Sequence, residues 1–323
     1  MQNMKVMVLN GVEQALEMQD RPDLVATTGQ TVVQLHAAAL NRRDAWIQMG
    51  QYGGLKFPIV LGSDGCGTTA DGRGVLIDPT LDWGPDPRAQ QRNFRILGLP
   101  DDGTLAEQVL VPSQNIYNKP THLSVEQAAA LPLAGLTAYR ALFTRADVQP
   151  GERVLITGIG AGTAGLALQF AQAAGAQVWV TSGNEAKLQR ATELGALGGA
   201  NYKDAEWGKK LAASGPFDVI IDSAGGDGFA QLIELTKPGG RIVNFGATVG
   251  NPNQIDLRRI FWKQLSILGT TMGNPHDFAA MLRFVGDKKI IPIVDQVFPL
   301  ADANAALQRL RAADQFGKIV LAQ

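Results

Sequence analysis

The chain is poor in cysteine, histidine and net charge, and each shortage excludes a class of protein. Its 323 residues contain one cysteine, Cys66, so an intrachain disulfide and a cysteine-rich zinc site are both excluded. The 3 histidines have no spacing that indicates a catalytic triad. The formal net charge of −1 argues against a nucleic-acid partner or an anionic membrane surface. With no signal-peptide pattern and no apolar run long enough to span a bilayer, we expect a soluble cytoplasmic protein.

Residues 153–182 are typical of a nucleotide-binding β-turn-α-β unit. A short apolar run at 154–156 predicts a buried parallel strand, and a small-residue helix and a second strand follow. The glycines between strand and helix allow a tight turn and a close backbone approach, while the helix N-terminus offers free N–H groups to a phosphate. Two registers remain open, Gly160-x-Gly162-x-x-Gly165 or a turn running from Gly158. The predicted cofactor contacts are Gly160, Gly162, Thr163 and Ala164.

The end of the second strand indicates which dinucleotide the chain prefers. An NAD site needs an acidic residue there to accept a hydrogen bond from the ribose 2′-hydroxyl. This strand ends at Ser182 with no acid, and Lys187 follows on the next helix. A hydroxyl with a basic residue suits a 2′-phosphate, so we predict NADP(H). The alternative for Lys187 is an ordinary solvated helix lysine.

The pattern of elements predicts two domains, one of them discontinuous. Residues 1–118 contain short β-like runs separated by Gly, Pro and Asp, and they predict a β-rich catalytic domain. Residues 119–271 alternate strands with helices and predict a doubly wound Rossmann sheet of the α/β class. Residues 272–323 follow the sixth strand and are expected to complete the catalytic domain. The polar stretch 79–95 is interpreted as an exposed lobe.

Short segments along the whole chain carry a family resemblance. In order and spacing they resemble the medium-chain dehydrogenase/reductase superfamily, and most closely its zinc-free quinone oxidoreductase branch, which includes the zeta-crystallins. The resemblance implies a GroES-like fold for the β-rich domain. The segments are 39–44 (ALNRRD), 61–67 (LGSDGCG), 134–139 (AGLTAY), the turn 158–165, 222–226 (DSAGG), 245–247 (FGA) and 317–321 (GKIVL).

The chain departs from the zinc-dependent members of that superfamily at their ligand positions. Asn41 stands where they have a Cys, Ser63-Asp64 stand where they have His-Glu, and Leu133 lies near a further Cys position. A catalytic zinc needs several converging N, S or O ligands and an open position. Residues 79–98 also lack the cysteines of the structural zinc lobe. The resemblance therefore implies that no metal is bound.

The resemblance also implies roles for single residues. Asn41 would hydrogen-bond the nicotinamide ribose or the substrate. The other implied cofactor contacts are Thr137 near the carboxamide, Ser182, Lys187 and Tyr202 around the adenosine phosphate, Phe245, Gly246 and Ala247 at the nicotinamide ribose, and Lys318 from the tail. Three of these residues have plainer alternative roles. Thr137 would bond only its own helix backbone, Tyr202 would be a half-buried strand residue, and Lys318 would be an edge-strand lysine.

Without zinc, nothing in the sequence polarises a simple ketone, so we expect hydride transfer to an electrophilic small molecule, a quinone or an α,β-unsaturated carbonyl. Asn41 and Tyr52 are the catalytic candidates, and Tyr52 or water would deliver a proton. Trp46 and Met49 would join Tyr52 in an apolar wall, or pack in the core.

Two other functions stay open. One is a zinc-independent reductase or dehydrogenase of another carbonyl or an acyl thioester, with Arg42-Arg43 or Arg258-Arg259 binding a CoA phosphate. The other is an NADPH-binding sensor or structural protein with little turnover. By resemblance we also expect a homodimer that pairs through the sixth Rossmann strand, residues 265–270, because an apolar edge strand favours such pairing.

Overall fold

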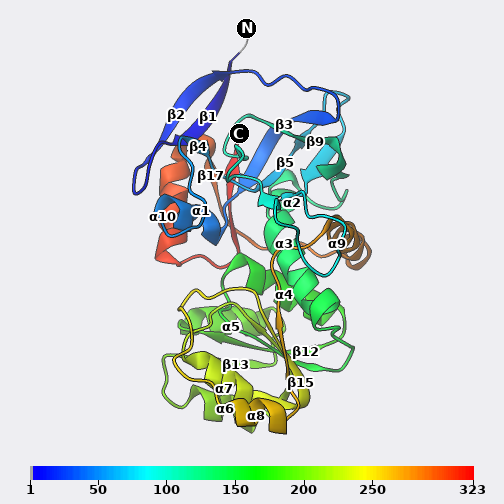
Figure 1. Ribbon diagram of the computed structural model, residues 1–323, viewed down its shortest axis with the longest axis vertical. Helices are drawn as coiled ribbons and strands as arrows, with labels where there is room; N and C mark the ends of the chain where they lie inside the picture. The colour runs from blue at the N-terminus through cyan, green and yellow to red at the C-terminus, as the bar shows by residue number, and fades with distance from the viewer. Residues whose placement is uncertain (1–2) are drawn as a thin grey trace. The chain divides into compact units, whose positions relative to one another are not determined.

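The computed structural model describes residues 3–323, which fall into two compact units. The first unit runs to Leu136 and resumes with Gly273–Gln323, and the second is Thr137–Met272. The orange-to-red end of the chain returns to the blue N-terminal strands in Figure 1, and β18 (Lys318–Ala322) pairs there with β3 (Gln30–Ala39). A discontinuous unit therefore places residues from both ends of the sequence in one sheet.

The first unit is rich in short strands. Its largest sheet has seven strands in the order β10-β6-β5-β3-β18-β17, with β9 also paired to β3. Its further elements are β1 (Asn3–Leu9), β2 (Leu16–Pro22), α1 (Arg42–Gln48), β4 (Ile59–Val60), β5 (Asp64–Thr68), β6 (Gly74–Ile77), β7 (Thr80–Leu81), β8 (Arg95–Ile96), β9 (Gln108–Pro112), β10 (Ile116–Asn118), α2 (Val125–Ala129), α3 (Pro132–Tyr139), which continues into the second unit, α9 (Pro275–Lys288), β17 (Val294–Pro299) and α10 (Ala303–Ala312).

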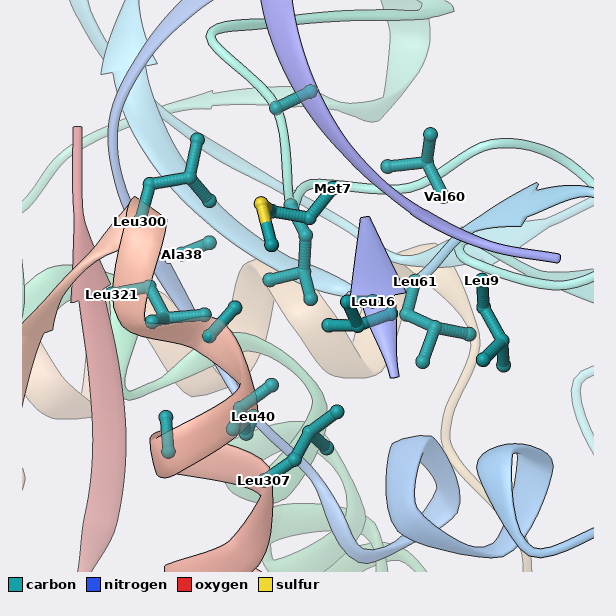
Figure 2. Packing of buried hydrophobic residues seen from close by; sticks show 14 of the residues in the cluster. Met7, Leu9, Leu16, Ala38, Leu40, Val60, Leu61, Leu300, Leu307 and Leu321 are labelled. Carbon is teal, nitrogen blue, oxygen red and sulfur yellow. The ribbon is translucent and has the colours of Figure 1, made fainter. Parts of the chain in front are cut away.

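The main core of the first unit joins residues from the beginning and the end of the chain. Figure 2 shows side chains of the N-terminal strands, such as Met7 and Leu9, gathered with Leu300, Leu307 and Leu321 of the tail. All five side chains are at least 94% buried. Burying a leucine-sized side chain contributes about 1.5–3 kcal/mol, so this core ties the tail to the N-terminal strands.

The second unit is a six-stranded parallel sheet in the order β13-β12-β11-β14-β15-β16. This is the doubly wound order that the alternation of strands and helices predicts, and it confirms the Rossmann fold. Its elements are β11 (Arg153–Ile156), α4 (Gly162–Ala173), β12 (Gln177–Ser182), α5 (Glu185–Glu193), β13 (Gly198–Asn201), α6 (Trp207–Ala213), β14 (Phe217–Asp222), α7 (Gly228–Leu235), β15 (Thr236–Asn244), α8 (Leu257–Trp262) and β16 (Ser266–Gly269).

Two details differ from the sequence-based expectation. The first unit extends to Leu136 rather than to residue 118, because α2 packs against β3 and β5. The stretch 79–95 is also not an exposed lobe throughout. Thr80, Leu81 and Trp83 are at least 96% buried, because β7 pairs with β8 and the Trp83 ring packs edge-on against Phe94.

Among residues 3–323, no helix combines the length and the apolar character that crossing a membrane requires.

Candidate active site and cofactor-binding edge

The glycine turn after β11 has a backbone that only glycine adopts easily. Gly158 and Gly160 have φ angles of +70° and +113°, and α4 begins at Gly162. The backbone turn therefore starts at Gly158, and Gly165 lies inside the helix. Ala161 precedes the helix and provides no side-chain cap, so the first-turn N–H groups of Gly162, Thr163 and Ala164 keep the orientation that suits a phosphate.

Ser182 is in place at the end of β12, next to this turn. It is 4% exposed, and its Oγ accepts the Asn184 N–H at 3.3 Å and lies 3.4 Å from the Ile159 carbonyl. Asn184 in turn caps α5 by accepting N–H groups at 2.9 and 3.3 Å. The cap fixes the residue at which α5 starts, and it therefore fixes the position of Lys187 in the first turn of the helix.

Lys187 lies over the glycine turn. A Cβ atom built on Gly160 would be 2.6 Å from Lys187 Cδ, so a larger residue at 160 would displace this side chain. On the other side of Ser182, a Cβ built on Gly183 would be 2.7 Å from the Tyr202 hydroxyl and 2.9 Å from Lys203 Cε. The strand end thus carries two lysines and a phenol around small residues. This donor set fits a phosphorylated ribose, and the open glycine backbone fits a dinucleotide.

The next strand ends are organised by Asp222. Its carboxylate accepts hydrogen bonds from Thr157 Oγ1 at 2.8 Å and Asn244 Nδ2 at 2.9 Å. It also accepts the N–H of Gly225 at 3.0 Å, so one buried acid connects β11, β14 and β15. Phe245 and Gly246, both partly exposed, and the exposed Ala247 follow β15 directly. Thr137 lies in α3 and is 6% exposed.

The first unit contains a buried polar cluster made of Asn41, Asp64 and Lys318. Lys318 Nζ donates to Asn41 Oδ1 at 2.6 Å and to Asp64 Oδ2 at 2.8 Å. Asn41 Nδ2 also donates to Asp64 Oδ2, at 2.9 Å. The exposed fractions are 7% for Asn41, 0% for Asp64 and 4% for Lys318. A charged pair this deeply buried is tolerated only when the two charges are paired and hydrogen-bonded, as they are here.

Backbone groups hold the members of this cluster in position. The Asn41 N–H donates to Asp44 Oδ2 at 2.7 Å, and Asp44 also accepts the Gly62 N–H at 3.2 Å. Burial raises the pKa of Asp44, and the neighbouring Arg43 charge opposes that shift. Asp64 Oδ1 accepts the Leu133 N–H at 2.7 Å, which orients the carboxylate toward Lys318.

Gly317 places Lys318 at the start of β18. Its φ of +112° and a Cβ that would lie 2.5 Å from the Ile293 carbonyl make glycine necessary there. Because β18 runs between β3 and β17, the edge-strand alternative for Lys318 is wrong. The lysine is an internal residue whose ammonium reaches Asn41.

A second group of polar residues surrounds Arg43. The guanidinium donates to Ser63 Oγ at 2.8 Å and to the Leu97 carbonyl at 2.9 Å, and it lies 5.1 Å from the centre of the Tyr52 ring. Its Nε is 3.5 Å from the Tyr52 hydroxyl. Tyr52 is partly buried and packs with Met49 against the core, which agrees with the packing alternative for Met49.

The Arg42-Arg43 patch proposed for a CoA phosphate is wrong. Arg43 is 6% exposed because Ser63 and Leu97 bind it inside the unit. Arg42 donates to the Leu310 carbonyl at 2.9 Å and is partly buried. On α8, Arg258 and Arg259 are exposed but pair with Asp256 and Glu234.

The residues at the implied zinc-ligand positions do not form a zinc site. Asn41 Oδ1 accepts from an ammonium, Ser63 Oγ donates to the Leu97 carbonyl, and Leu133 contributes a backbone N–H. Within residues 3–323 no three His, Cys, Asp or Glu side chains gather as metal ligands would. A cation already occupies the acceptor atoms, so the donor set does not fit a zinc ion.

Sequence reasoning missed two residues of these sites. Asp64 stands at a zinc-ligand position of the superfamily, which gives no sign that it binds both Asn41 and Lys318. Lys203 directly follows Tyr202, and that position is the one sequence signal for a phosphate contact at this residue.

Comparison with known proteins agrees with the fold of the two units. The family model described as "Alcohol dehydrogenase GroES-like domain" matches residues 27–121, and "Zinc-binding dehydrogenase" matches residues 162–287. A "Zinc-type alcohol dehydrogenase-like protein YogA" of Leptosphaeria maculans is 34% identical over 90% of each chain. A crystal structure titled "NAD-dependent alcohol dehydrogenase" superposes with a TM-score of 0.92 and 36% identity over 100% of both chains.

Two further relatives carry more specific names. A "Quinone oxidoreductase-like protein 2" of Bos taurus is 30% identical over 75% of this chain and 73% of its own length. An "Acryloyl-coenzyme A reductase" of Metallosphaera sedula is 28% identical over 98% of this chain and 99% of its own. Fold, glycine turn and matches together define an oxidoreductase. The chain belongs to the medium-chain dehydrogenase/reductase superfamily.

Proposed function

We propose that the protein is a zinc-independent, NADPH-dependent reductase of quinones or α,β-unsaturated carbonyls. The observation that carries this proposal is the Asn41–Asp64–Lys318 cluster, in which an ammonium takes the acceptor atoms that a metal would need. Without a metal to polarise a simple ketone, an already electron-poor acceptor is the easier substrate. The relative named for quinones supports this class of acceptor.

The cofactor assignment rests on the end of β12. The hydroxyl of Ser182 and the amines of Lys187 and Lys203 would bind a 2′-phosphate, with the Tyr202 hydroxyl beside them. A carboxylate suited to a free ribose 2′-hydroxyl is absent at Ser182 itself. The glycine turn and the first turn of α4 would bind the pyrophosphate, with Phe245, Gly246 and Ala247 beside the ribose. When bound, the reduced nicotinamide supplies the hydride.

On the acceptor side, Asn41 would orient the substrate and Tyr52 or water would deliver the proton. The Arg43 Nε lies 3.5 Å from the Tyr52 hydroxyl and its guanidinium lies over the Tyr52 ring, so Arg43 would hold the phenol in position for proton delivery. A Tyr52→Phe variant with unchanged turnover would remove this role.

The experiment measures oxidation of NADPH by metal-free protein from the absorbance of the reduced nicotinamide. Benzoquinone, phenanthrenequinone, a simple enone and crotonyl-CoA are compared as acceptors, with NADH as the control cofactor. Turnover of quinones or enones with NADPH supports the proposal, and one equivalent of zinc found by elemental analysis contradicts it. Preference for crotonyl-CoA would favour the acyl-thioester alternative, which the acryloyl-coenzyme A reductase relative supports. Binding of NADPH without any turnover would favour a sensor.

Lys187→Gln is expected to raise the KM for NADPH about 10-fold and to leave the KM for NADH nearly unchanged, because one charge–phosphate hydrogen bond contributes about 1.5 kcal/mol. Lys209→Gln is the matched control, since Lys209 lies on α6 with its side chain 81% exposed. An equal rise in KM for NADPH and NADH would show that Lys187 does not bind the 2′-phosphate.

We further propose a homodimer that pairs through β16. This strand ends the sheet, so its outer backbone groups have no partner strand in the described chain. Large apolar side chains are exposed nearby, with Leu257, Phe261 and Trp262 of α8 at 69%, 63% and 82% and Ile267 of β16 at 40%. An apolar patch of this kind is usual at subunit contacts.

Ile267→Lys is therefore expected to convert a dimer of micromolar stability into a monomer while the circular dichroism spectrum stays unchanged, because a charge would face the partner strand. Sedimentation of the wild-type and variant chains measures the change. Leu197→Lys, at an exposed position (61%) far from β16 in the sheet order, is the control. A wild-type monomer at micromolar concentration would contradict the dimer.

A further inference from the structure

The Lys318 ammonium has hydrogen-bonding capacity that its surroundings do not use. An ammonium carries three N–H donors, and the structure gives Lys318 two acceptors, Asn41 Oδ1 and Asp64 Oδ2. Within residues 3–323 no third acceptor is found for this group. Asn41 Nδ2 likewise has two N–H donors and uses one of them, on Asp64. Two neighbouring donors are therefore left for a ligand oxygen.

The position of these two donors is rigid. Lys318 starts a central strand after a glycine with a positive φ, and Asn41 precedes α1 with its backbone N–H held by Asp44. Asp64 holds both side chains and receives a backbone N–H from Leu133. Prearranged donors in a buried site stabilise a developing negative charge far better than mobile water does.

Local charge also favours this use. The Asp64 carboxylate forms an ion pair with the Lys318 ammonium at 2.8 Å, and the two side chains are 0% and 4% exposed. Lys318 and Asn41 are only 4% and 7% exposed, so little water competes for their donors. In such surroundings a hydrogen bond from an ammonium to an oxyanion is stronger than in bulk water.

We propose that Lys318 is the fixed cation that polarises the carbonyl oxygen of the acceptor, and that the second Asn41 amide N–H assists it. The inference rests on the proposed reductase function and deepens it, because it assigns to this chain's own ammonium the charge that a metal supplies elsewhere in the superfamily. It replaces the expectation that Lys318 serves only to contact the cofactor.

The balance of the step follows from this arrangement. As a hydride with its electron pair adds to the β-carbon of an enone, the C=C π pair shifts to form the enolate and the carbonyl π pair moves onto oxygen. Lys318 and Asn41 donate hydrogen bonds to that oxygen. A proton from Tyr52 or water then reaches the α-carbon, which gives the saturated ketone and oxidised cofactor. For a quinone, the hydride adds to one carbonyl oxygen, the π pairs shift through the ring onto the other oxygen, and protonation of that second oxygen gives the hydroquinone.

The first test compares Lys318→Met with the wild type across acceptors of different electron demand. We expect kcat to fall about 100-fold to 1,000-fold with an enone, the loss typical of removing an oxyanion donor, and to fall less with a strongly electron-poor quinone. Because Lys318→Met leaves Asp64 charged and buried, the double variant Lys318→Met, Asp64→Asn is measured beside it. Lys56→Met, at an exposed position in the same unit, is the control. An equal loss for all acceptors, or a weaker binding of NADPH with unchanged kcat, would overturn the inference.

The second test does not depend on turnover. Nitrophenol is bound to the protein in the presence of NADP⁺, and its visible absorbance reports whether it is ionised. We expect the wild type to bind the phenolate and the double variant to lose this preference, because the ammonium stabilises the oxyanion form. Ionisation that is the same in both proteins would overturn the inference. If the phenolate preference depends on Lys318 but no acceptor is reduced, the proposed reductase function fails while the cation site stands.

Discussion

Asp64→Ala is expected to destabilise the first unit by about 3–5 kcal/mol, the loss observed when one partner of a buried ion pair is removed. The Asp64 carboxylate binds Lys318 Nζ, Asn41 Nδ2 and the Leu133 N–H. Alanine removes the Asp64 acceptor from all three donors, and the ammonium at 4% exposure keeps only Asn41 Oδ1, with no other carboxylate in contact among the described residues. The midpoint of urea unfolding, followed by far-UV circular dichroism, measures the change.

The matched control is Asp64→Asn, which keeps one acceptor oxygen for these donors and is expected to lose less. Combining Asp64→Ala with Lys318→Met completes a double-mutant cycle. We expect the double variant to be more stable than the sum of the single losses predicts, because it removes the uncompensated charge. Additive losses, or a loss of less than about 1 kcal/mol for Asp64→Ala, would show that the pair is not coupled in this way.

Asp78 is expected to make the protein less stable as the pH rises from about 4 to about 7. Asp78 follows β6 and is 0% exposed, and burial raises its pKa to about 7. The Thr80 N–H, 2.9 Å from Oδ1, opposes this shift, and the nearby Asp277 charge adds to it. Among residues 3–323, Asp78 Oδ2 has no hydrogen-bond partner. The burial of this acid therefore disfavours its charged form.

The direction follows from proton linkage. The pKa of Asp78 is about 4 in the unfolded chain and higher in the folded chain. At a pH between these two values, Asp78 holds a proton in the native state that it has lost in the unfolded state. The stabilisation is complete below about pH 4 and is lost as the pH rises through the folded pKa, by about 4 kcal/mol in total for a shift of this size. Asp78→Asn removes this group from the titration.

Unfolding free energies of the wild type and Asp78→Asn are compared at several pH values between about 4 and 8. We expect the unfolding free energy of the wild type to fall as the pH rises, and that of Asp78→Asn to fall less steeply, whatever the absolute stability of the variant. Asp86→Asn is the control, because Asp86 is a surface acid whose pKa its ion pair with Arg88 lowers. Equal slopes for wild type and Asp78→Asn would contradict the assignment.

Much of the second unit follows from local sequence. An apolar run before a glycine turn and the alternation of strands and helices predict the strand order, since right-handed connections leave few arrangements. A capping box at the start of α2 is also local in sequence, with Gln127 N–H donating to Ser124 Oγ at 3.2 Å. Each of these signals involves residues close in sequence, where backbone geometry alone decides the outcome.

The first unit was less predictable from its sequence. Residues 16–22 form β2 with little apolar alternation, because pairing with β1 over its full length stabilises the strand. Trp83 was expected on the surface because Pro and Asp surround it, yet it is 3% exposed. Cross-strand pairing and packing override local composition in both places.

The Rossmann sheet, the glycine turn and the strand end without an acid can be predicted from short segments, because they depend on periodicity and on what glycine and small side chains permit. The surroundings of Arg43, Asp64 and Lys318 are set by the folded chain instead. Asp64 and Lys318 are 254 residues apart along the chain, and their contact exists because the tail returns to pair with β3. Burial then makes the difference between an ordinary lysine and a fixed internal charge, and burial is a property of the packed chain rather than of any short segment.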